Sequence, residues 1–527
     1  MKKNTVKLFV LAIAMGGSFS VFGQVKNPAR VKMDDVSVRR LHELSAQFKE
    51  KAKAEYEEAV RLAQLNNWPL VVKEDGWRYS TLTKVDSNGL PVYTGTSNVG
   101  SAITSRTNHL QPGGSLGLNL TGEFGSEDPM YVGVWDGGYA RSSHVDLVGR
   151  TFPYDGGSAN NQDHPTHVTG TIIGNGTGNA NARGMASKAV AYNSTYEWDA
   201  SEMAQFASEG FVLSNHSYGI DQGALSDSQK AQMRGSYIDI SRDVDVIMFN
   251  APYYQPVFAA GNDGEGAYDI LTDRACSKNG IAVAAVWQVN NYENNGSVFI
   301  TSFSSWGPTN DKRIKPDIST KGINVLSCTN GGNSAYESQQ GTSMAAPGIT
   351  GTLLLLQQYY ANLHADGGPK NFMKSATVRA LVAHSADEAG DKGPDPVYGW
   401  GLMNAKRAAE ILAADAENTN SKIQELVLLP GQTYEYQVTA SGNAPLVATL
   451  AWTDPPASTT TSSNPVLINN LDIKVKQGGT THLPWRLDSG TGTYAEKGEN
   501  NVDNIEKVEV NNASGVYTVS KAIRKLR

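Results

Sequence analysis

The stretch YVGVWD, residues 131–136, is a run of mostly apolar residues that a single aspartate closes. Further short apolar runs follow between residues 189 and 326, namely AVAYN, FVLSN, QPVFAA, IAVAAV and INVL. Segments with helical character alternate with them, such as SEMAQFASEG (201–210) and TLLLLQQYYANL (352–363). Short apolar runs that alternate with helices are typical of a parallel sheet buried on both faces. The sequence therefore predicts an α/β domain in which helices cover both faces of a parallel sheet.

Polar side chains lie at or just beyond the ends of these runs, where an open parallel sheet collects its ligands. Asp136 closes the first run, Asn262 follows QPVFAAG, and His164 lies in QDHPTHVTGT just before a helix-like stretch. Ser343, in GTSMAAPG, completes the set. A serine nucleophile needs a base, the base needs an orienting carboxylate, and the oxyanion needs a hydrogen-bond donor. The four residues can fill these roles.

Together these motifs resemble the subtilisin-like, or subtilase, family of serine peptidases. The matching pieces are DGG at 136–138, HPTHVTGT, AAGN and GTSMAAP, with SFSSWGP, KPDI and YGWGLMNA. The resemblance implies that Asp136 orients His164, that His164 acts as general base and then general acid, and that Ser343 attacks the peptide carbonyl. It implies that Asn262 stabilises the oxyanion and that the reaction is endopeptide hydrolysis through an acyl-enzyme. The substrate-binding residues it implies are Ser217, Tyr218, Gly219, Ala260 and Gly261.

Two residues depart from the usual pattern of this family. Pro165 replaces the glycine that most relatives have after the histidine, and it fits if His164 lies just before a helix, where proline is favoured. Gly137 follows Asp136 in place of Ser or Thr, which removes one side-chain hydrogen bond to the carboxylate. Another proline, Pro347, is expected in about the first turn of the helix that Ser343 begins, where its missing N–H costs least.

Four segments are expected along the 527 residues. Residues 1–23 have the basic start, apolar stretch and small residues of a cleaved secretory signal. Residues 24–110 are a prosegment and linker, with an amphipathic helix over about 33–66, short strands after it, and a Gly/Ser/Asn/Thr-rich linker from about 94 to 125. Residues 111–415 are the catalytic domain, and 420–527, with short alternating runs, form a β-sandwich that ends shortly after its last predicted strand.

Composition and the signal limit the environment and the partners. The net charge is −7 with 18% charged residues, so nothing indicates nucleic-acid binding. The signal predicts a protein that is secreted, periplasmic or held at the cell surface, with no membrane segment after cleavage. The expected partners are polypeptide substrates and the chain's own prosegment, acting as an intramolecular inhibitor, and the protein is expected to be a monomer.

The chemistry needs no cofactor, whereas structural calcium is an expectation on family grounds. Its candidate ligands are Asp454, Asn469, Asn470 and Asp472. Asn/Asp clusters more often form turns, so no metal site is assigned. His167 is interpreted as a structural histidine on the helix because no third ligand lies at metal spacing, and His144 and Asp146 are interpreted as loop structure. Cys276 and Cys328 form either one disulfide or two buried thiols.

Two other hypotheses compete with the peptidase. An α/β-hydrolase esterase needs G-x-S-x-G and the chain order serine, acid, histidine. This chain has G-x-S-x-A, and its serine comes last. A non-catalytic binding or adhesion protein of the same fold is the alternative from another class, but such proteins usually lose a triad residue and none is missing here.

Overall fold

The computed structural model describes residues 31, 33–66, 68–74, 78–85, 91–96, 102–125, 128–156, 162–264, 266–364, 371–417, 422–429 and 431–526. The predicted signal, residues 1–23, lies outside the described residues. None of the helices within the described ranges is both long and apolar enough to cross a membrane.

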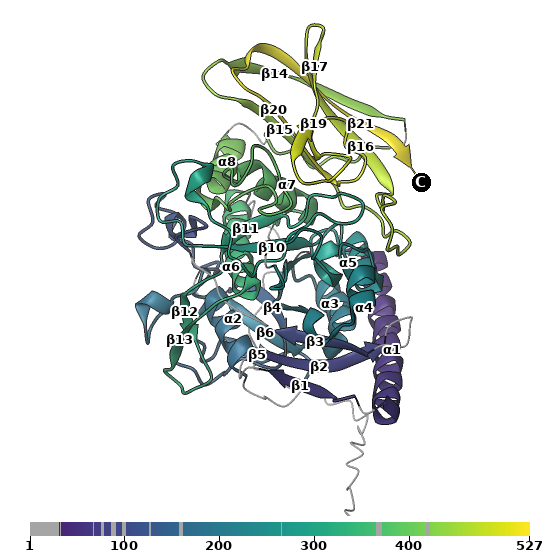
Figure 1. The fold of residues 1–527 in the computed structure, drawn as a ribbon. Coiled ribbons are helices and arrows are strands. Elements are labelled where there is room, and N and C mark those ends of the chain that lie inside the picture. Colours follow the sequence, from purple (N-terminus) through teal and green to yellow (C-terminus); the bar gives the residue numbers. More distant parts are fainter. Residues whose placement is uncertain are drawn as a thin grey trace, which may run out of the picture.

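A seven-stranded parallel sheet runs through the middle of the molecule (Figure 1). Its spatial order is β11-β10-β9-β7-β4-β6-β5, and every neighbouring pair is parallel. The strands are β4 (Tyr131–Asp136), β5 (Thr151–Pro153), β6 (Val190–Thr195), β7 (Leu213–His216), β9 (Gln255–Ala259), β10 (Ile281–Val286) and β11 (Ile318–Lys321). The predicted α/β fold is confirmed.

Helices cover both faces because alternate side chains of β4, an inner strand, point to opposite sides. Val132 and Val134 join one core and Tyr131 and Trp135 the other. The first core includes residues of α2 (Asp163–Ile173), α6 (Thr342–Leu363), α7 (Ser375–Ser385) and α8 (Ala405–Glu417). The second includes residues of α3 (Asp199–Ser208) and α5 (Asp239–Asn250), while α4 (Asp227–Met233) lies between β8 and α5 in the chain.

The run INVL differs from its prediction as a strand of the main sheet. It contributes to β12 (Val325–Cys328), which pairs only with β13 (Tyr336–Gln339) in a two-stranded antiparallel sheet. The edge strand of the main sheet is instead β11, which is fully buried although three of its four residues are polar or charged. Buried position outweighs side-chain propensity here, as is usual for strands.

The N-terminal segment forms α1 (Asp35–Asn66), β1 (Val71–Glu74), β2 (Arg78–Val85) and β3 (Pro91–Thr96), which confirms the predicted helix. The helix buries Leu41, Leu44 and Phe48 in the same core as α3 and α5. The three strands extend into a four-stranded sheet whose last member is β8 (Tyr218–Ile220). Residues 35–96 are thus docked onto the middle of the chain through both a helix and a strand (Figure 1).

Residues 102–125 were predicted to be a linker, and the structure differs. Leu110 and Leu120 are buried in the main core. The Gln111 side-chain amide donates to the carbonyl of Met185 at 2.8 Å, and Gly122 N–H donates to Gln358 Oε1 at 2.8 Å. A Cβ atom on Gly122 would lie 2.9 Å from the side chains of Ala186 and Ala189, a close approach that composition alone does not distinguish from a linker.

The C-terminal segment is antiparallel, as predicted, with β14 (Thr433–Ser441), β15 (Leu446–Ala451), β16 (Asn469–Gln477), β17 (Thr480–His482), β18 (Trp485–Leu487), β19 (Ala495–Lys497), β20 (Ile505–Val510) and β21 (Ser514–Leu526). A sheet in the order β14-β21-β16-β17 and the pair β15-β20 share one hydrophobic core. The final residues SKAIRKL belong to β21, which pairs with strands on both sides. The apolar run ELVLL, residues 425–429, lies in the segment predicted to be a sandwich but is not a strand.

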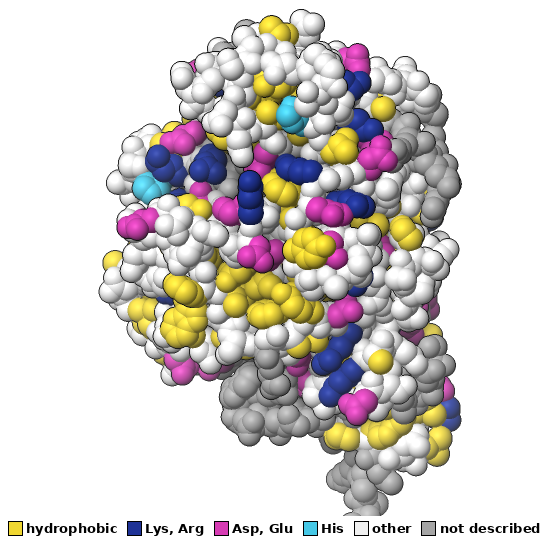
Figure 2. Space-filling view, turned by 45° about the horizontal axis from the view of Figure 1, so that its top comes forward, with side chains coloured by type: hydrophobic (Ala, Val, Ile, Leu, Met, Phe, Trp, Pro, Cys, Tyr) yellow, Lys and Arg dark blue, Asp and Glu magenta, His cyan; other side chains and the backbone are white. Residues whose placement is uncertain are grey.

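The surface agrees with the composition. In the view of Figure 2, basic and acidic side chains are interspersed across the face.

Candidate active site

Asp136 and His164 form the first half of the site. Asp136 ends β4, an inner strand of the main sheet, and is completely buried. His164 Nδ1 lies 2.7 Å from Asp136 Oδ1 and 2.6 Å from Oδ2. The backbone N–H of Gly137 also donates to Oδ1, at 2.7 Å, so the backbone supplies a hydrogen bond although Gly137 has no side chain to give one. Because Nδ1 is engaged by the carboxylate, Nε2 is the ring nitrogen able to act as a base.

Helix α2 carries His164 in its first turn. Gln162 is the N-cap, so His164 is the second helical residue and Pro165 the third. The sequence predicted His164 just before the helix and Pro165 as its first residue, whereas the helix begins two residues earlier, at Asp163. Proline is tolerated here all the same, because the first N–H groups of a helix have no partner within it.

Ser343 begins α6 in the same manner, as its second residue after the N-cap Gly341. Gly341 has φ 147°, a conformation that favours glycine. The Ser343 hydroxyl donates to the carbonyl of Ser217 at 2.9 Å, and the hydroxyl of Ser217 donates to the carbonyl of Ser343 at 2.5 Å. These two bonds tie the predicted nucleophile to the residue that precedes strand β8.

Pro347 explains one of these bonds and corrects a prediction. It is the sixth residue of α6, inside the helix and beyond the first turn. A residue at this position would normally donate its N–H to the carbonyl of Ser343, four residues earlier, but proline has no N–H. The Ser217 hydroxyl satisfies that carbonyl instead. The proline thus creates the acceptor that Ser217 uses.

Asn262 is held by Thr342, a residue that the sequence analysis missed. Asn262 Oδ1 accepts from Thr342 N–H at 2.7 Å and from the Thr342 hydroxyl at 3.1 Å. The same hydroxyl accepts from Gly261 N–H at 3.0 Å. Since the amide oxygen faces Thr342, the amide NH₂ group points to the other side. In the sequence, the only indication of this role of Thr342 is its place directly before the predicted nucleophile in the motif GTS.

The predicted substrate-binding residues lie around β8 and the end of β9. The Tyr218 side chain is buried, and its hydroxyl donates to Asp199 Oδ2 at 2.6 Å. β3 pairs antiparallel with β8, with Gly95 opposite Gly219 and Thr96 opposite Tyr218. Ala260 is buried, and Gly261 has φ 109° and would bring a Cβ atom within 2.8 Å of Ser305 Oγ.

The other predicted histidines make protein contacts. His167 is buried, and its Nε2 lies 3.1 Å from the carbonyl of Glu337; burial lowers its pKa to about 3, so the ring is neutral. His144, Asp146 and Cys328 have side-chain ligand atoms within 4.8 Å of one another. Asp146 accepts from Gly178 N–H and the Tyr336 hydroxyl, each at 2.8 Å, which assigns it to loop structure.

The two cysteines and Asp454, one of the candidate calcium ligands, make contacts within the protein. Cys276 and Cys328 are separate buried thiols, not a disulfide. The Asp454 carboxylate lies 2.6 Å from Lys278 Nζ and accepts two backbone N–H groups, so an ammonium group occupies the place that a calcium ion at Asp454 would need.

One protein-family model matches the region of the chain that contains these residues. Residues 129–401 match the model of the subtilase family, which is more than half of the chain. The chain belongs to the subtilase family. The match includes Asp136, His164, Asn262 and Ser343.

Curated relatives are similar to this subtilase over parts of their length. C5a peptidase of Streptococcus pyogenes is 37% identical over 130 residues, which are 24% of this chain and 11% of that protein. The serine protease/ABC transporter B family protein tagA of Dictyostelium discoideum is 30% identical over 34% of this chain and 12% of its own length. The related protein tagD of the same organism is 27% identical over 40% of this chain and 15% of its own length. This chain therefore corresponds to a small part of those relatives.

Among solved structures, a mutant of the protease domain of PatA is similar to this chain. The alignment covers 54% of this chain and 95% of that chain, with 21% sequence identity and a TM-score of 0.41. The assignment to the family rests on the family model, and the names of the relatives support a serine-type peptidase.

Glu202 is a residue of α3 whose carboxyl group has a raised pKa. Its Oε2 accepts from the indole N–H of Trp135, the neighbour of Asp136, at 2.8 Å. Burial, with the nearby Asp155, raises its pKa to about 8. The proton is therefore bound more tightly in the folded protein than in the unfolded chain, where the pKa is 4.5. The protonated Glu202 carboxyl therefore contributes to the free energy of unfolding at low pH. This contribution is lost as the pH rises from about 4.5 to about 8.

Glu202→Gln is expected to remove this loss, because glutamine keeps the acceptor for Trp135 and cannot ionise. The wild type should lose at most ~1.4 kcal/mol per pH unit relative to the variant across this range. Urea unfolding at pH 5 and pH 8, in a Ser343→Ala background that prevents self-digestion, measures the difference. Glu197→Gln, at an exposed position of the same segment, is the control. A gap that does not widen with pH contradicts the prediction.

Proposed function

We propose that this subtilase is a secreted serine endopeptidase, made as a precursor and acting as a monomer outside the cytoplasm or at the cell surface. The observation that supports the proposal is the carboxylate–imidazole pair at the end of β4, where His164 Nδ1 lies 2.6 Å from Asp136 Oδ2. A serine at the start of α6 belongs to the same matched region, and an asparagine amide is anchored to the residue before that serine.

In the proposed reaction His164 Nε2 takes the proton of Ser343 Oγ as that oxygen attacks the peptide carbonyl. Asp136 holds the ring in the required tautomer and stabilises its charged form. The oxyanion accepts hydrogen bonds from the amide of Asn262 and from the N–H of Ser343, which belongs to the first turn of a helix. His164 then protonates the leaving amine. Water, activated by the same ring, releases the acyl group and restores Ser343.

Peptide substrates are proposed to bind as an extended strand along β8, presenting main-chain groups to Ser217 and Gly219. The chain's own β3 supports this proposal, since it already pairs with β8. It runs antiparallel to β8 and places Thr96 opposite Tyr218, the residue after Ser217, whose carbonyl binds the Ser343 hydroxyl. The antiparallel direction is the one proposed for the acyl side of a substrate.

The N-terminal segment is accordingly proposed to be an inhibitory prosegment. Besides β3, its helix α1 holds the catalytic domain by polar contacts. Lys51 Nζ lies 2.8 Å from Asp243 Oδ2, and the Ser201 hydroxyl donates to the carbonyl of Ser45 at 2.6 Å. A segment that occupies the substrate strand blocks substrate until it is removed.

The function is tested with a fluorophosphonate probe and casein. The wild-type protein, purified after expression of the full chain, is expected to form a covalent adduct at Ser343 and to hydrolyse casein, because an activated serine attacks phosphorus as it attacks a carbonyl. Mass spectrometry of the labelled peptide locates the adduct. His164→Ala is the matched variant and should prevent both reactions. If the wild type neither labels nor cleaves casein, the peptidase proposal is wrong and a binding protein of this fold becomes the better hypothesis.

A further inference from the structure

We propose that the C-terminal domain positions the substrate-binding strand β8, with residues 273–279 as the link. The proposal rests on the proposed function and adds positioning residues to it. Asn279, Asp454 and Asn504 are assigned this role, because they join the far end of the link to the β-sandwich.

The first end of the link holds the backbone of β8. Asp273 is buried, and its Oδ2 accepts from Ile220 N–H at 2.8 Å. A Cβ atom on Gly219 would lie only 3.0 Å from the same oxygen, so the carboxylate lies directly against the strand. Asp273 has φ 45°, a left-handed conformation that is uncommon outside glycine and must be held by its surroundings. Its carbonyl accepts from the Ser241 hydroxyl at 2.5 Å.

The next residue holds the side chain of the same strand. The Arg274 guanidinium lies 4.8 Å from the centre of the Tyr218 ring. Arg274 Nη2 forms an ion pair with Asp199 Oδ2 at 2.5 Å, and the same oxygen accepts from the Tyr218 hydroxyl at 2.6 Å. Displacement of residues 273 and 274 would therefore move both the backbone and the one large side chain of β8.

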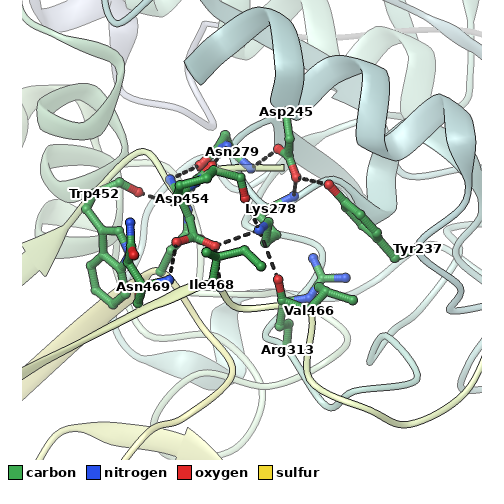
Figure 3. A network of polar contacts seen from close by, with 12 residues as sticks. Tyr237, Asp245, Lys278, Asn279, Arg313, Trp452, Asp454, Val466, Ile468 and Asn469 are labelled. Carbon is green, nitrogen blue, oxygen red and sulfur yellow. Dashed lines mark hydrogen bonds and ion pairs between the residues drawn. The ribbon is translucent and has the colours of Figure 1, made fainter. Parts of the chain in front are cut away.

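The other end of the link is held by the C-terminal domain (Figure 3). The side chains of Lys278 and Asp454 are both completely buried, and their charged atoms lie 2.6 Å apart. Lys278 Nζ also donates to the carbonyls of Pro455 and Val466, at 2.5 and 3.0 Å. An ammonium group so far from water is satisfied only while these partners stay in place.

Asn279 and Asp454 exchange two hydrogen bonds across the contact between the link and the C-terminal domain. The Asn279 amide donates to the carbonyl of Asp454 at 2.9 Å and accepts from Asp454 N–H at 2.9 Å. Asn504 donates to the same Asn279 oxygen at 2.8 Å and to the carbonyl of Trp452 at 2.9 Å. On the catalytic side, Asp245 accepts from the backbone N–H groups of Lys278 and Asn279.

Hydrogen bonds within residues 273–279 and to Arg313 restrain the backbone of the link. Ser277 bonds back to the carbonyl of Arg274 through its N–H at 3.1 Å and its hydroxyl at 2.7 Å. The carbonyl of Cys276 accepts from Arg313 Nη1 at 2.8 Å. The segment is short and internally bonded, so a shift of Lys278 and Asn279 is transmitted to Asp273 and Arg274.

The test removes the domain contact without creating a buried charge. Asn279→Ala deletes the reciprocal pair, and Asn504→Ala deletes only the bond from the sandwich side, as a milder second variant. Thr449→Val is the matched control, because Thr449 bonds His384 Nδ1 at 2.9 Å across the same domain interface without touching residues 273–279. Hydrogen–deuterium exchange of peptides covering residues 217–220 is measured in the full chain carrying Ser343→Ala.

We expect exchange at residues 217–220 to be about fivefold faster in Asn279→Ala, less so in Asn504→Ala, and unchanged in Thr449→Val. In chains that keep Ser343, KM for a peptide should rise about fivefold, while the rate of labelling by a small fluorophosphonate stays within about twofold of wild type.

Unchanged exchange in both asparagine variants overturns the proposal, as does equal acceleration in Thr449→Val, which would indicate general loosening. If Asn279→Ala does not fold, the milder Asn504→Ala decides. A wild type that cleaves no peptide would refute the peptidase function, yet the exchange measurement would still decide whether the domain holds β8.

Discussion

Replacing Ser343 by alanine is expected to lower kcat for peptide hydrolysis by ~10⁶-fold and to leave the precursor uncut. The magnitude is that known for the nucleophile of subtilisin, a member of the same family. Without Oγ no acyl-enzyme forms, although binding and the oxyanion donors remain. The measurement is kcat on a peptide substrate, with intact mass of the purified chain to detect loss of the N-terminal segment.

Ser338→Ala is the control, since Ser338 lies five positions before Ser343, on the exposed strand β13. That variant should mature and hydrolyse peptides like the wild type. A Ser343→Ala protein that loses residues 35–96 would show that another protease processes the precursor. One that still hydrolyses peptides would refute the assigned nucleophile.

The fold and the predicted catalytic residues were accessible from the sequence for a common reason. Buried parallel strands are continuous apolar runs, and the polar residues that follow them gather at one edge of the sheet. Asp136 and Asn262 follow such strands, and His164 and Ser343 begin helices on the same core. The motif resemblance supplied the roles, which neither burial nor periodicity can provide.

What the sequence could not predict are bonds between residues distant in the chain. Pro347 looked like a helix-start residue because nothing nearby shows that Ser217, 126 positions before Ser343, supplies the missing hydrogen bond. Asp454 looked like a turn residue or a calcium ligand. Its partner Lys278 lies 176 positions away. A buried ion pair leaves no local pattern, since each member alone resembles a surface residue.

Replacing Asn262 by alanine is expected to lower kcat by on the order of 10²- to 10³-fold with KM changed less than about threefold. The magnitude is that known for the corresponding donor of subtilisin. The amide NH₂ would bind the oxygen only once it carries negative charge, so its loss raises the transition state and not the bound ground state. Steady-state kinetics on one peptide substrate measure both constants.

Alanine also removes the acceptor that holds Thr342, and Asn262→Asp separates the two effects. Aspartate keeps an oxygen for Thr342 N–H and its hydroxyl, at the positions now 2.7 and 3.1 Å away, but has no N–H to donate. If the amide stabilises the oxyanion, aspartate should lose as much kcat as alanine or more, because a carboxylate also repels the developing charge. If Asn262 serves only to hold Thr342 beside Ser343, aspartate should restore most of the activity. Restoration, or a loss that falls wholly on KM, would assign Asn262 a supporting role and leave the N–H of Ser343 as the proposed oxyanion donor.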